Sequence, residues 1–225
     1  MRYKSVISAR FVSRPNRFIA VAELDGREEI CHVMNTGRMR ELLVPGAEIF
    51  LLPAENPARK TKFDLVAVRR GDEIVNIDSL APNRVAAEYI PTLFTGCKLI
   101  KPETKFGNSR FDFYIEDNFD KIFLEVKGVT LNRDGIAVFP DAPTLRGAKH
   151  LRELAAAKAQ GYRAAVLFVI AMKGIFSFAP NRETDPDFAD ALSEAARAGV
   201  EIYAADCRVE PDFIAAENKI PVCLE

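Results

Sequence analysis

Two segments of this chain carry polar residues whose spacing could support a hydrolytic reaction. Residues 110–115 and 122–127 each alternate apolar with polar side chains, which is typical of a strand with one buried face. Asp112 belongs to the polar set of the first segment, and Glu125 and Lys127 belong to that of the second. If the two segments pair as a hairpin, both apolar sets turn toward one core, so the three polar side chains share a surface.

Two carboxylates beside an ammonium suit the metal-assisted hydrolysis of a phosphodiester. Cross-strand neighbours lie about 5 Å apart, so Asp112 and Glu125 can share one hard cation, and such oxygen ligands select Mg²⁺ or Mn²⁺. The cation lowers the pKa of a bound water, while Lys127 orients the nucleophile or stabilises the phosphate. The alternative is a solvated strand face with cross-strand charge pairs. Phe123 falls on the same side as Glu125, which indicates that this face is partly buried.

The segments around this pair predict an α/β domain. The run 164–170 is continuously apolar, as a strand covered on both faces requires. Gly161 and Gly199 follow stretches with helical periodicity and are expected to end them. A helix, three strands, a helix and a strand in succession give an antiparallel beginning and a later crossover, unlike a doubly wound nucleotide fold. We expect helices at Arg84–Leu93, Thr144–Gln160 and Phe188–Ala198, and strands at Lys98–Ile100, Arg110–Glu116, Ile122–Val129, Ala164–Ile170 and Glu201–Ala205.

The first part of the chain predicts a small barrel. Short runs of β-branched and aromatic residues are separated by turn residues, and Asp25-Gly26 is a tight hairpin signal. A short helix is expected at Arg38–Leu43, between the third and fourth strands. This is the element order of an OB-fold, although other small barrels share it. The expected strands are Val6–Val12, Phe18–Leu24, Glu28–Met34, Glu48–Leu52 and Phe63–Val68, with Glu73–Ile77 as a further strand leading out.

Composition narrows the classes of function. With 225 residues, 48% hydrophobic and 28% charged, the chain suffices for one large or two small folded domains. No apolar run approaches the roughly 20 residues that cross a bilayer, and a signal peptide is not apparent, so we expect a cytoplasmic protein without a membrane partner. Four irregularly spaced cysteines and two histidines argue against disulfides and a multi-histidine zinc centre. Common nucleotide-binding and hydrolase motifs are absent from the sequence, and no organic cofactor is expected.

Charge is distributed unevenly along the chain. Residues 1–70 carry 13 Lys and Arg against 8 Asp and Glu, whereas residues 181–225 carry 4 against 11. The basic end favours a polyanion such as DNA as partner, and an ordinary solvated surface is the alternative. The acidic region near Asp185–Glu194 would serve a protein partner equally well.

The long predicted helix carries a polar stripe. Arg146, Lys149, His150 and Glu153 are spaced so that they fall on one face, which could meet a DNA phosphate beside the acidic site. His150 could also serve as an acid, but a lone helical histidine is more often packed or solvated. The candidate DNA contacts of the whole chain are Arg10, Arg14, Arg17, Arg38, Lys60, Lys62, Arg110, Arg146, Lys149 and His150.

Two features of the barrel segment fit nucleic acid. Phe11 and Phe18 are interleaved with arginines, as on a platform that stacks single-stranded bases, although phenylalanines of a small barrel are more often core. In the turn 35–38, Gly37 offers a positive φ, and Thr36 can cap the short helix and leave N–H groups for an anion. A plain barrel turn is the alternative.

The spacing of Asp112 and Glu125-Val126-Lys127, in this order of elements, resembles the PD-(D/E)xK nuclease core. Along nearly its whole length the chain resembles the sugar fermentation stimulation protein family. That resemblance implies an α/β fold (α+β overall), with an OB-fold-like β-barrel in residues 1–80 and a PD-(D/E)xK nuclease-like mixed-sheet domain in residues 81–225. The matching residues are Asn35-Thr36-Gly37, Asn56-Pro57 with Lys60-Thr61, Pro82-Asn83-Arg84 with Glu88, 109–113, 125–127 with 129–131, 139–142, and Arg146-Gly147 with 149–154.

The resemblance also implies a site and a function. Asp112, Glu125 and Lys127 become the metal-binding and catalytic set, and Glu88 is a candidate extra acidic ligand, with an exposed helical glutamate as the alternative. Non-specific DNA binding and a regulatory role in sugar (maltose) metabolism are implied, but cleavage is not. We therefore predict a DNA-binding protein first, a Mg²⁺- or Mn²⁺-dependent deoxyribonuclease second, and a small-ligand or protein-interaction module third.

Overall fold

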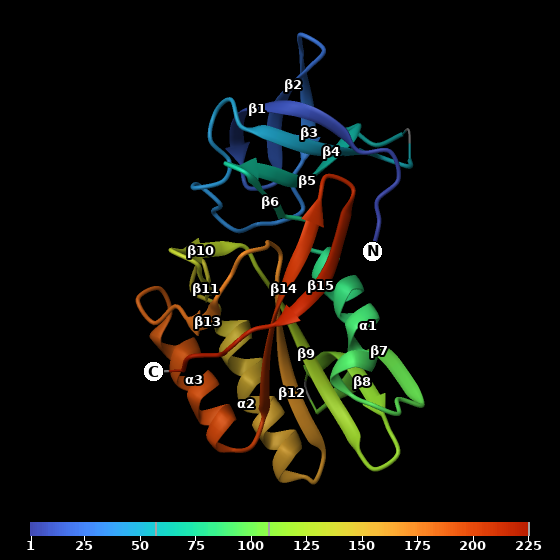
Figure 1. Cartoon of the computed structure of the whole chain (residues 1–225), viewed down its shortest axis with the longest axis vertical. Helices are drawn as coiled ribbons and strands as arrows, with labels where there is room; N and C mark the ends of the chain where they lie inside the picture. Colours follow the sequence, from blue (N-terminus) through green and yellow to red (C-terminus); the bar gives the residue numbers. More distant parts are fainter. Residues whose placement is uncertain (57, 108, 225) are drawn as a thin grey trace.

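The computed structural model describes residues 1–56, 58–107 and 109–224. Pro57 of the Asn56-Pro57 motif, and Glu225 at the end of the predicted second domain, lie outside the described residues. A β-barrel and a larger α/β part are stacked along the longest axis of the molecule (Figure 1).

The predicted OB-type barrel is confirmed. Its strands follow the order β3-β2-β1-β4-β5-β6, and parallel pairing of β3 with β5 closes it. Asp25 and Gly26 both have positive φ, as the predicted two-residue hairpin turn requires. The strands are β1 (Ile7–Asn16), β2 (Ile19–Leu24), β3 (Arg27–His32), β4 (Glu48–Pro53), β5 (Phe63–Arg70) and β6 (Glu73–Asn76).

The predicted helix at Arg38–Leu43 is wrong. The segment forms only a turn, closed by hydrogen bonds from the amides of Leu42 and Leu43 to the carbonyl of Met39. Met39 has a φ of 45°, which a right-handed helix does not accommodate, and Pro45 follows at once. The apolar residues that suggested a helix are nevertheless buried in the core.

The α/β part contains a six-stranded sheet of order β15-β14-β12-β9-β8-β7. As predicted, β7, β8 and β9 are antiparallel, while β12 runs parallel to both β9 and β14. Its strands are β7 (Leu99–Phe106), β8 (Ser109–Glu116), β9 (Lys121–Val129), β12 (Arg163–Ile170), β14 (Glu201–Glu210) and β15 (Phe213–Lys219), and its helices are α1 (Ala81–Leu93), α2 (Leu145–Ala159) and α3 (Pro186–Arg197).

Helices cover both faces of the sheet, as the apolar run of β12 predicts. Ile90 of α1 packs in one buried cluster with Leu124 and Val126. Leu151 of α2 and Phe188 of α3 pack in another, on the opposite face. Thr144 caps α2, because its hydroxyl accepts a hydrogen bond from the amide of Gly147 at 3.0 Å. Asp185 caps α3 in the same way.

Several strands escaped prediction. A three-stranded sheet is formed by β10 (Leu131–Arg133), β11 (Ile136–Phe139) and β13 (Ser177–Pro180), and β15 pairs antiparallel with β14 at the sheet edge. Asp134 and Gly135, both with positive φ, close the β10–β11 hairpin. These strands are short or polar, so their sequences carry a weak alternation signal.

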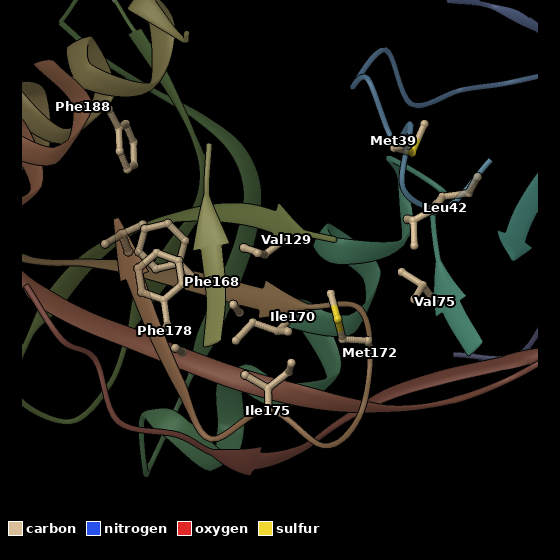
Figure 2. Close-up of a cluster of buried hydrophobic side chains, with 14 of the residues drawn as sticks. Met39, Leu42, Val75, Val129, Phe168, Ile170, Met172, Ile175, Phe178 and Phe188 are labelled. Atoms are coloured by element: carbon tan, nitrogen blue, oxygen red, sulfur yellow. The ribbon is translucent and has the colours of Figure 1, made fainter. Parts of the chain in front are cut away.

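The barrel and the α/β part share one core. Met39, Leu42 and Val75 of the barrel belong to the same buried cluster as Ile170 and Met172, which Figure 2 shows meeting at the junction. The two parts are therefore joined by buried apolar contacts as well as by the covalent chain. Among the described residues, the helices are too short and too polar to span a membrane.

Candidate active site

Asp112 lies where β8 and β9 part. Their ladder extends as far as the Phe113–Leu124 pair. Beyond it, one carboxylate oxygen of Asp112 accepts the amide of Val126 at 2.7 Å, and the other accepts the side-chain amide of Asn83 at 2.9 Å. The carboxylate thus takes the place of a backbone partner and is fixed between β9 and the first turn of α1.

This arrangement corrects the expected strand alternation. Phe111 packs against Phe123 on the α2 face, whereas Phe113 belongs to the cluster on the α1 face. Strand β8 therefore does not keep one apolar face through Asp112. The predicted partial burial around Phe123 is confirmed, since that ring and Glu125 are both buried.

Glu125 is 3% exposed and points toward α2. Its Oε1 accepts hydrogen bonds from the ammonium of Lys127, at 2.7 Å, and from Nδ1 of His150. Its Oε2 is buried without a hydrogen-bond partner among the described residues. Buried carboxylate oxygens are normally satisfied, so this oxygen marks a place where a ligand fits.

The environment separates the pKa values of the two carboxyl groups. Burial raises the pKa of Asp112 above its ordinary value, and the nearby charge of Glu125 raises it further. Burial also acts to raise the pKa of Glu125, but the hydrogen bond from His150 and the charge of Lys127 outweigh it and lower that pKa overall. Glu125 is therefore the firmly ionised member of the pair, and a cation near both would favour ionisation of Asp112 as well.

Asp112 and Glu125 together form the acidic cluster of the site. A shallow basic cavity of about 450 Å³ opens beside the acidic cluster. The structure brings together Arg110 from β8 and Arg146 and Lys149 from α2, as the stripe on the long helix predicts. His150 lies at the base of the cavity, where its Nε2 accepts a hydrogen bond from Nε of Arg146 at 3.4 Å. His150 is buried and hydrogen-bonded to Glu125. The side chains that can contact a phosphate directly are therefore Arg110, Arg146 and Lys149.

The structure does not bring Glu88 to this site. Its carboxylate is exposed and pairs with the N-terminal amine of Met1 at 2.8 Å. Within residues 1–56, 58–107 and 109–224, no three His, Cys, Asp or Glu side chains are gathered so as to hold a metal. Of the predicted acidic ligands, the structure thus leaves Asp112 and Glu125 as the candidates at this site.

The candidate contacts on the barrel divide into exposed cations and one structural arginine. The guanidinium of Arg14 donates to the backbone carbonyls of four residues of the adjoining turns, so its predicted role in DNA binding is corrected to a structural one. Arg17 is exposed and stacks over the partly exposed ring of Phe18, whereas Phe11 is buried in the core. Arg10, Arg38, Lys60 and Lys62 are exposed.

In the turn 35–38, two of the amides expected to be open to an anion already have acceptors. The amide of Gly37 donates to the side chain of Asn35, and that of Arg38 donates to the carboxylate of Asp141. Gly37 does not have a positive φ, contrary to prediction. Glycine is needed there because a Cβ would lie 2.5 Å from an oxygen of Asp141.

Most carboxylates of the acidic region 185–194 already have partners. Asp185 caps α3, Asp187 pairs with Arg152, and Asp190 pairs with Arg182.

Prediction from the sequence also missed Asn83 as a site residue. Its place beside Pro82 at the start of a helix is the signal that could have pointed to it.

Comparisons with known proteins cover both parts of the chain. Residues 12–77 match the family model "SfsA N-terminal OB domain", and residues 80–213 match "Sugar fermentation stimulation protein RE domain". Sugar fermentation stimulation protein homologs from Desulfitobacterium hafniense strain Y51 and Clostridium beijerinckii are 53% and 51% identical. The alignments cover 100% of this chain in both cases, and 99% and 100% of the relatives.

A solved structure is similar over the whole fold. Pyrococcus furiosus SfsA in complex with Ca²⁺ superposes with a TM-score of 0.89 at 32% identity, over 99% of this chain and 97% of that one. The fold and the order of its two parts are thus shared with that protein.

Proposed function

The chain belongs to the sugar fermentation stimulation protein family, and we propose that it binds DNA through phosphate contacts with little sequence preference. We also propose that the protein is cytoplasmic. The family resemblance implies a role as a regulatory factor in sugar (maltose) metabolism. The observation that carries the binding proposal is the basic cavity beside Glu125, where cations from β8 and α2 converge.

The cations of this cavity are available to a phosphate. Arg110 is paired with Glu103 at 3.3 Å, and Lys149 with Glu153 at 3.7 Å. Arg110, Glu103 and Lys149 are largely exposed, and ion pairs of exposed groups contribute little to stability. A DNA phosphate can therefore replace Glu103 at small cost, whereas Glu153, the partner of Lys149, is only 21% exposed and would lose a donor when Lys149 turns to DNA. Contacts of these cations with phosphates carry no sequence information, which fits binding without sequence preference.

We also propose that the site holds a divalent cation. The Pyrococcus relative was solved in complex with Ca²⁺. In this chain, Asp112 and Glu125 would hold the ion, since Glu125 is buried, Asp112 is half-buried beside it, and one oxygen of Glu125 has no described partner. Carboxylates suit Ca²⁺, Mg²⁺ and Mn²⁺ alike, and Mg²⁺ or Mn²⁺ is the ion we expect for this chain.

Hydrolysis of the bound DNA is the second candidate function, and the position of Lys127 favours it. Glu125 holds the ammonium of Lys127 at 2.7 Å, on the edge of the acidic cluster. From there Lys127 can donate to a phosphate oxygen or orient an attacking water. Asn83 and the Val126 amide keep Asp112 in place. A divalent cation would supply the charge that stabilises the reacting phosphodiester.

A salt titration tests DNA binding. Labelled single- and double-stranded DNA is titrated by anisotropy against wild type, a double variant with Arg110→Gln and Lys149→Gln, and a control with Lys98→Gln and Lys121→Gln. The control lysines are exposed, and both lie beside Glu116 at the start of β9, whereas Glu125 and Lys127 lie near its end. We expect the first double variant to reduce the slope of log K against log salt by about 2, and the control to leave it unchanged. A slope near zero for wild type contradicts the proposal.

A cleavage assay separates the two candidate functions. The same DNA is incubated with Mg²⁺, Mn²⁺ or EDTA and with wild type, Glu125→Ala or Lys127→Ala, while binding is recorded in the same samples. Metal-dependent cleavage that both variants lose would establish a deoxyribonuclease. Binding without cleavage leaves a nuclease fold that holds DNA. Capture of a protein partner without nucleic acid would instead favour the interaction module.

A further inference from the structure

A second cavity, of about 690 Å³, lies at the junction of the barrel with α1. Three separate segments supply cations to its lining: Arg2 and Lys4 from the N-terminal segment, Arg59 from the loop between β4 and β5, and Arg84 from the first turn of α1. None of these residues belongs to the acidic cluster or to the basic cavity beside it. The three segments are far apart in the sequence, and only the fold brings their cations together.

Two of these cations, Lys4 and Arg84, have no anionic partner among the described residues, whereas Arg2 pairs with Asp212. Lys4 and Arg84 are exposed, and no described carboxylate lies within 4.0 Å of either. Arg59, by contrast, donates both terminal nitrogens to Asp64, at 2.7 Å each, which fixes its guanidinium in the wall of the cavity. The open positive charge is therefore that of Lys4 and Arg84.

The carboxylates that also line this cavity are largely occupied. Asp64 is held by Arg59 and by His32. Asp78 accepts the hydroxyl of Tyr3 at 3.0 Å and the amide of Leu80 at 2.8 Å. An anion approaching Lys4 and Arg84 thus meets carboxylates whose lone pairs are directed to other donors, and one further exposed acid, Glu55.

Part of the lining is apolar. Met34, Leu52, Pro53 and Leu80 contribute to the wall, and Leu80 is 54% exposed. An apolar surface beside two unpartnered cations matches a ligand with a flat, weakly polar part and a phosphate. A nucleotide unit has both, because its base can lie on apolar side chains while its phosphate pairs with Lys and Arg.

The cavity is placed to act together with the acidic cluster. In OB-folds, the loop between the fourth and fifth strands takes part in binding oligonucleotides, and here that loop contributes Arg59. Arg84 directly follows Asn83, whose amide holds Asp112. The first turn of α1 therefore places Asn83 at the acidic cluster and Arg84 at this cavity.

We infer that this cavity binds a nucleotide unit, with Lys4 and Arg84 contacting its phosphate and the Met34–Leu52–Leu80 wall contacting its base. The unit comes either from a DNA strand that continues toward the acidic cluster or from a free nucleotide. The first source extends the proposed DNA binding and depends on it. The second source is independent of it.

Binding of two probes distinguishes these sources. Wild type, a double variant with Lys4→Gln and Arg84→Gln, and the control with Lys98→Gln and Lys121→Gln are titrated with a labelled single strand of about 12 nucleotides and, by calorimetry, with dAMP. Both cavity residues are exposed, so we expect the variant to keep the wild-type thermal unfolding midpoint. We expect it to bind at least one probe about tenfold or more weakly, and the control to stay within about twofold for both.

The outcomes distinguish a DNA strand from a free nucleotide as the source, and they can also overturn the proposal. Weaker binding of the strand alone assigns the cavity to DNA, and weaker binding of dAMP assigns it to a free nucleotide even if wild type binds no DNA. If wild type binds DNA and the variant matches the control for both probes, the cavity proposal is overturned while the proposed function stands. If wild type binds neither probe, the cavity proposal is overturned, and the salt titration with double-stranded DNA decides the proposed function separately.

Discussion

The carboxylate of Glu125 and the ring of His150 are hydrogen-bonded across the interface between β9 and α2. Both side chains are buried, and the other ring nitrogen of His150 accepts a hydrogen bond from Arg146 in the basic cavity. A continuous chain of hydrogen bonds therefore joins the surface where DNA is proposed to bind to the acidic cluster. His150 acts here as a positioning residue, because it holds one oxygen of Glu125 and leaves the other without a described partner.

Replacing His150 tests this link through stability. His150→Ala leaves the buried Glu125 with one donor fewer and opens a gap under α2, so we expect the free energy of unfolding to fall by about 1–3 kcal/mol. Urea denaturation measures the change. Lys149→Ala is the matched control, since Lys149 is exposed on the same helix and its loss should change stability by no more than about 0.5 kcal/mol. Equal effects of the two substitutions would show that His150 has no special role.

Removing the charge of Glu125 tests the cation site. We expect Ca²⁺ or Mn²⁺ to raise the thermal unfolding midpoint of wild type, because an ion that binds only the folded state stabilises it by about 2.7 kcal/mol at a hundredfold excess over its Kd. Glu125→Gln should abolish this rise. Glu88→Gln should keep it, since Glu88 pairs with the N-terminal amine. A rise that persists in Glu125→Gln would place the ion elsewhere.

The site shows how far alternation of residue types carries a prediction. The period of two correctly places Glu125 and Lys127 on one face of β9, because that strand keeps a regular parallel pairing with β12 from Ile122 to Val129. It fails at Asp112, where the ladder ends and the side chain replaces a backbone partner. The bond between Glu125 and His150 joins a strand to a helix 25 residues later, and no local pattern encodes such a contact.

The barrel shows a similar limit. Strand propensity and the Asp25-Gly26 turn predict its strands and hairpin, since both depend on neighbouring residues. The segment after β3 has apolar residues at helical spacing, but the barrel core and the Met39 backbone decide its conformation instead. Composition likewise cannot distinguish a surface arginine from Arg14, whose role depends on four carbonyls that the fold brings together.

Arg14 and Arg17 should therefore behave differently when replaced. Arg14→Ala removes the donors of four backbone carbonyls, so we expect a loss of about 1–3 kcal/mol in the free energy of unfolding. Arg17→Ala should change stability by at most about 0.5 kcal/mol, because that side chain is exposed over Phe18. Urea denaturation of both variants is the measurement. A stable Arg14→Ala protein would return this arginine to the candidate DNA contacts.

The ion pair between Glu201 and Arg163 predicts an acid-sensitive contribution to stability. Burial acts to raise the pKa of Glu201, but hydrogen bonds from Arg163 and Tyr203 lower it overall below its ordinary value of 4.5. The unfolded chain therefore binds the proton more readily, so the contribution is complete above about pH 4.5 and is lost as the pH falls through the lowered pKa. Glu201→Gln should be less stable at neutral pH and should show a flatter decline on acidification. Parallel pH profiles of wild type and variant, measured by urea denaturation, would contradict this assignment.

Gly128 allows the first turn of α1 to approach β9, and with it the residue that holds Asp112. A Cβ at this position would lie 2.6 Å from Cγ of Pro82, the residue before Asn83. Gly128→Ala should therefore displace the turn and lower the free energy of unfolding by about 1–3 kcal/mol, as overpacking against the buried Pro82 does. Combining it with Pro82→Ala removes the clashing atom, so the double variant should be more stable than Gly128→Ala alone. Urea denaturation of wild type, both single variants and the double variant gives this coupling directly. Additive losses would mean that the close contact with Pro82 does not determine the need for glycine.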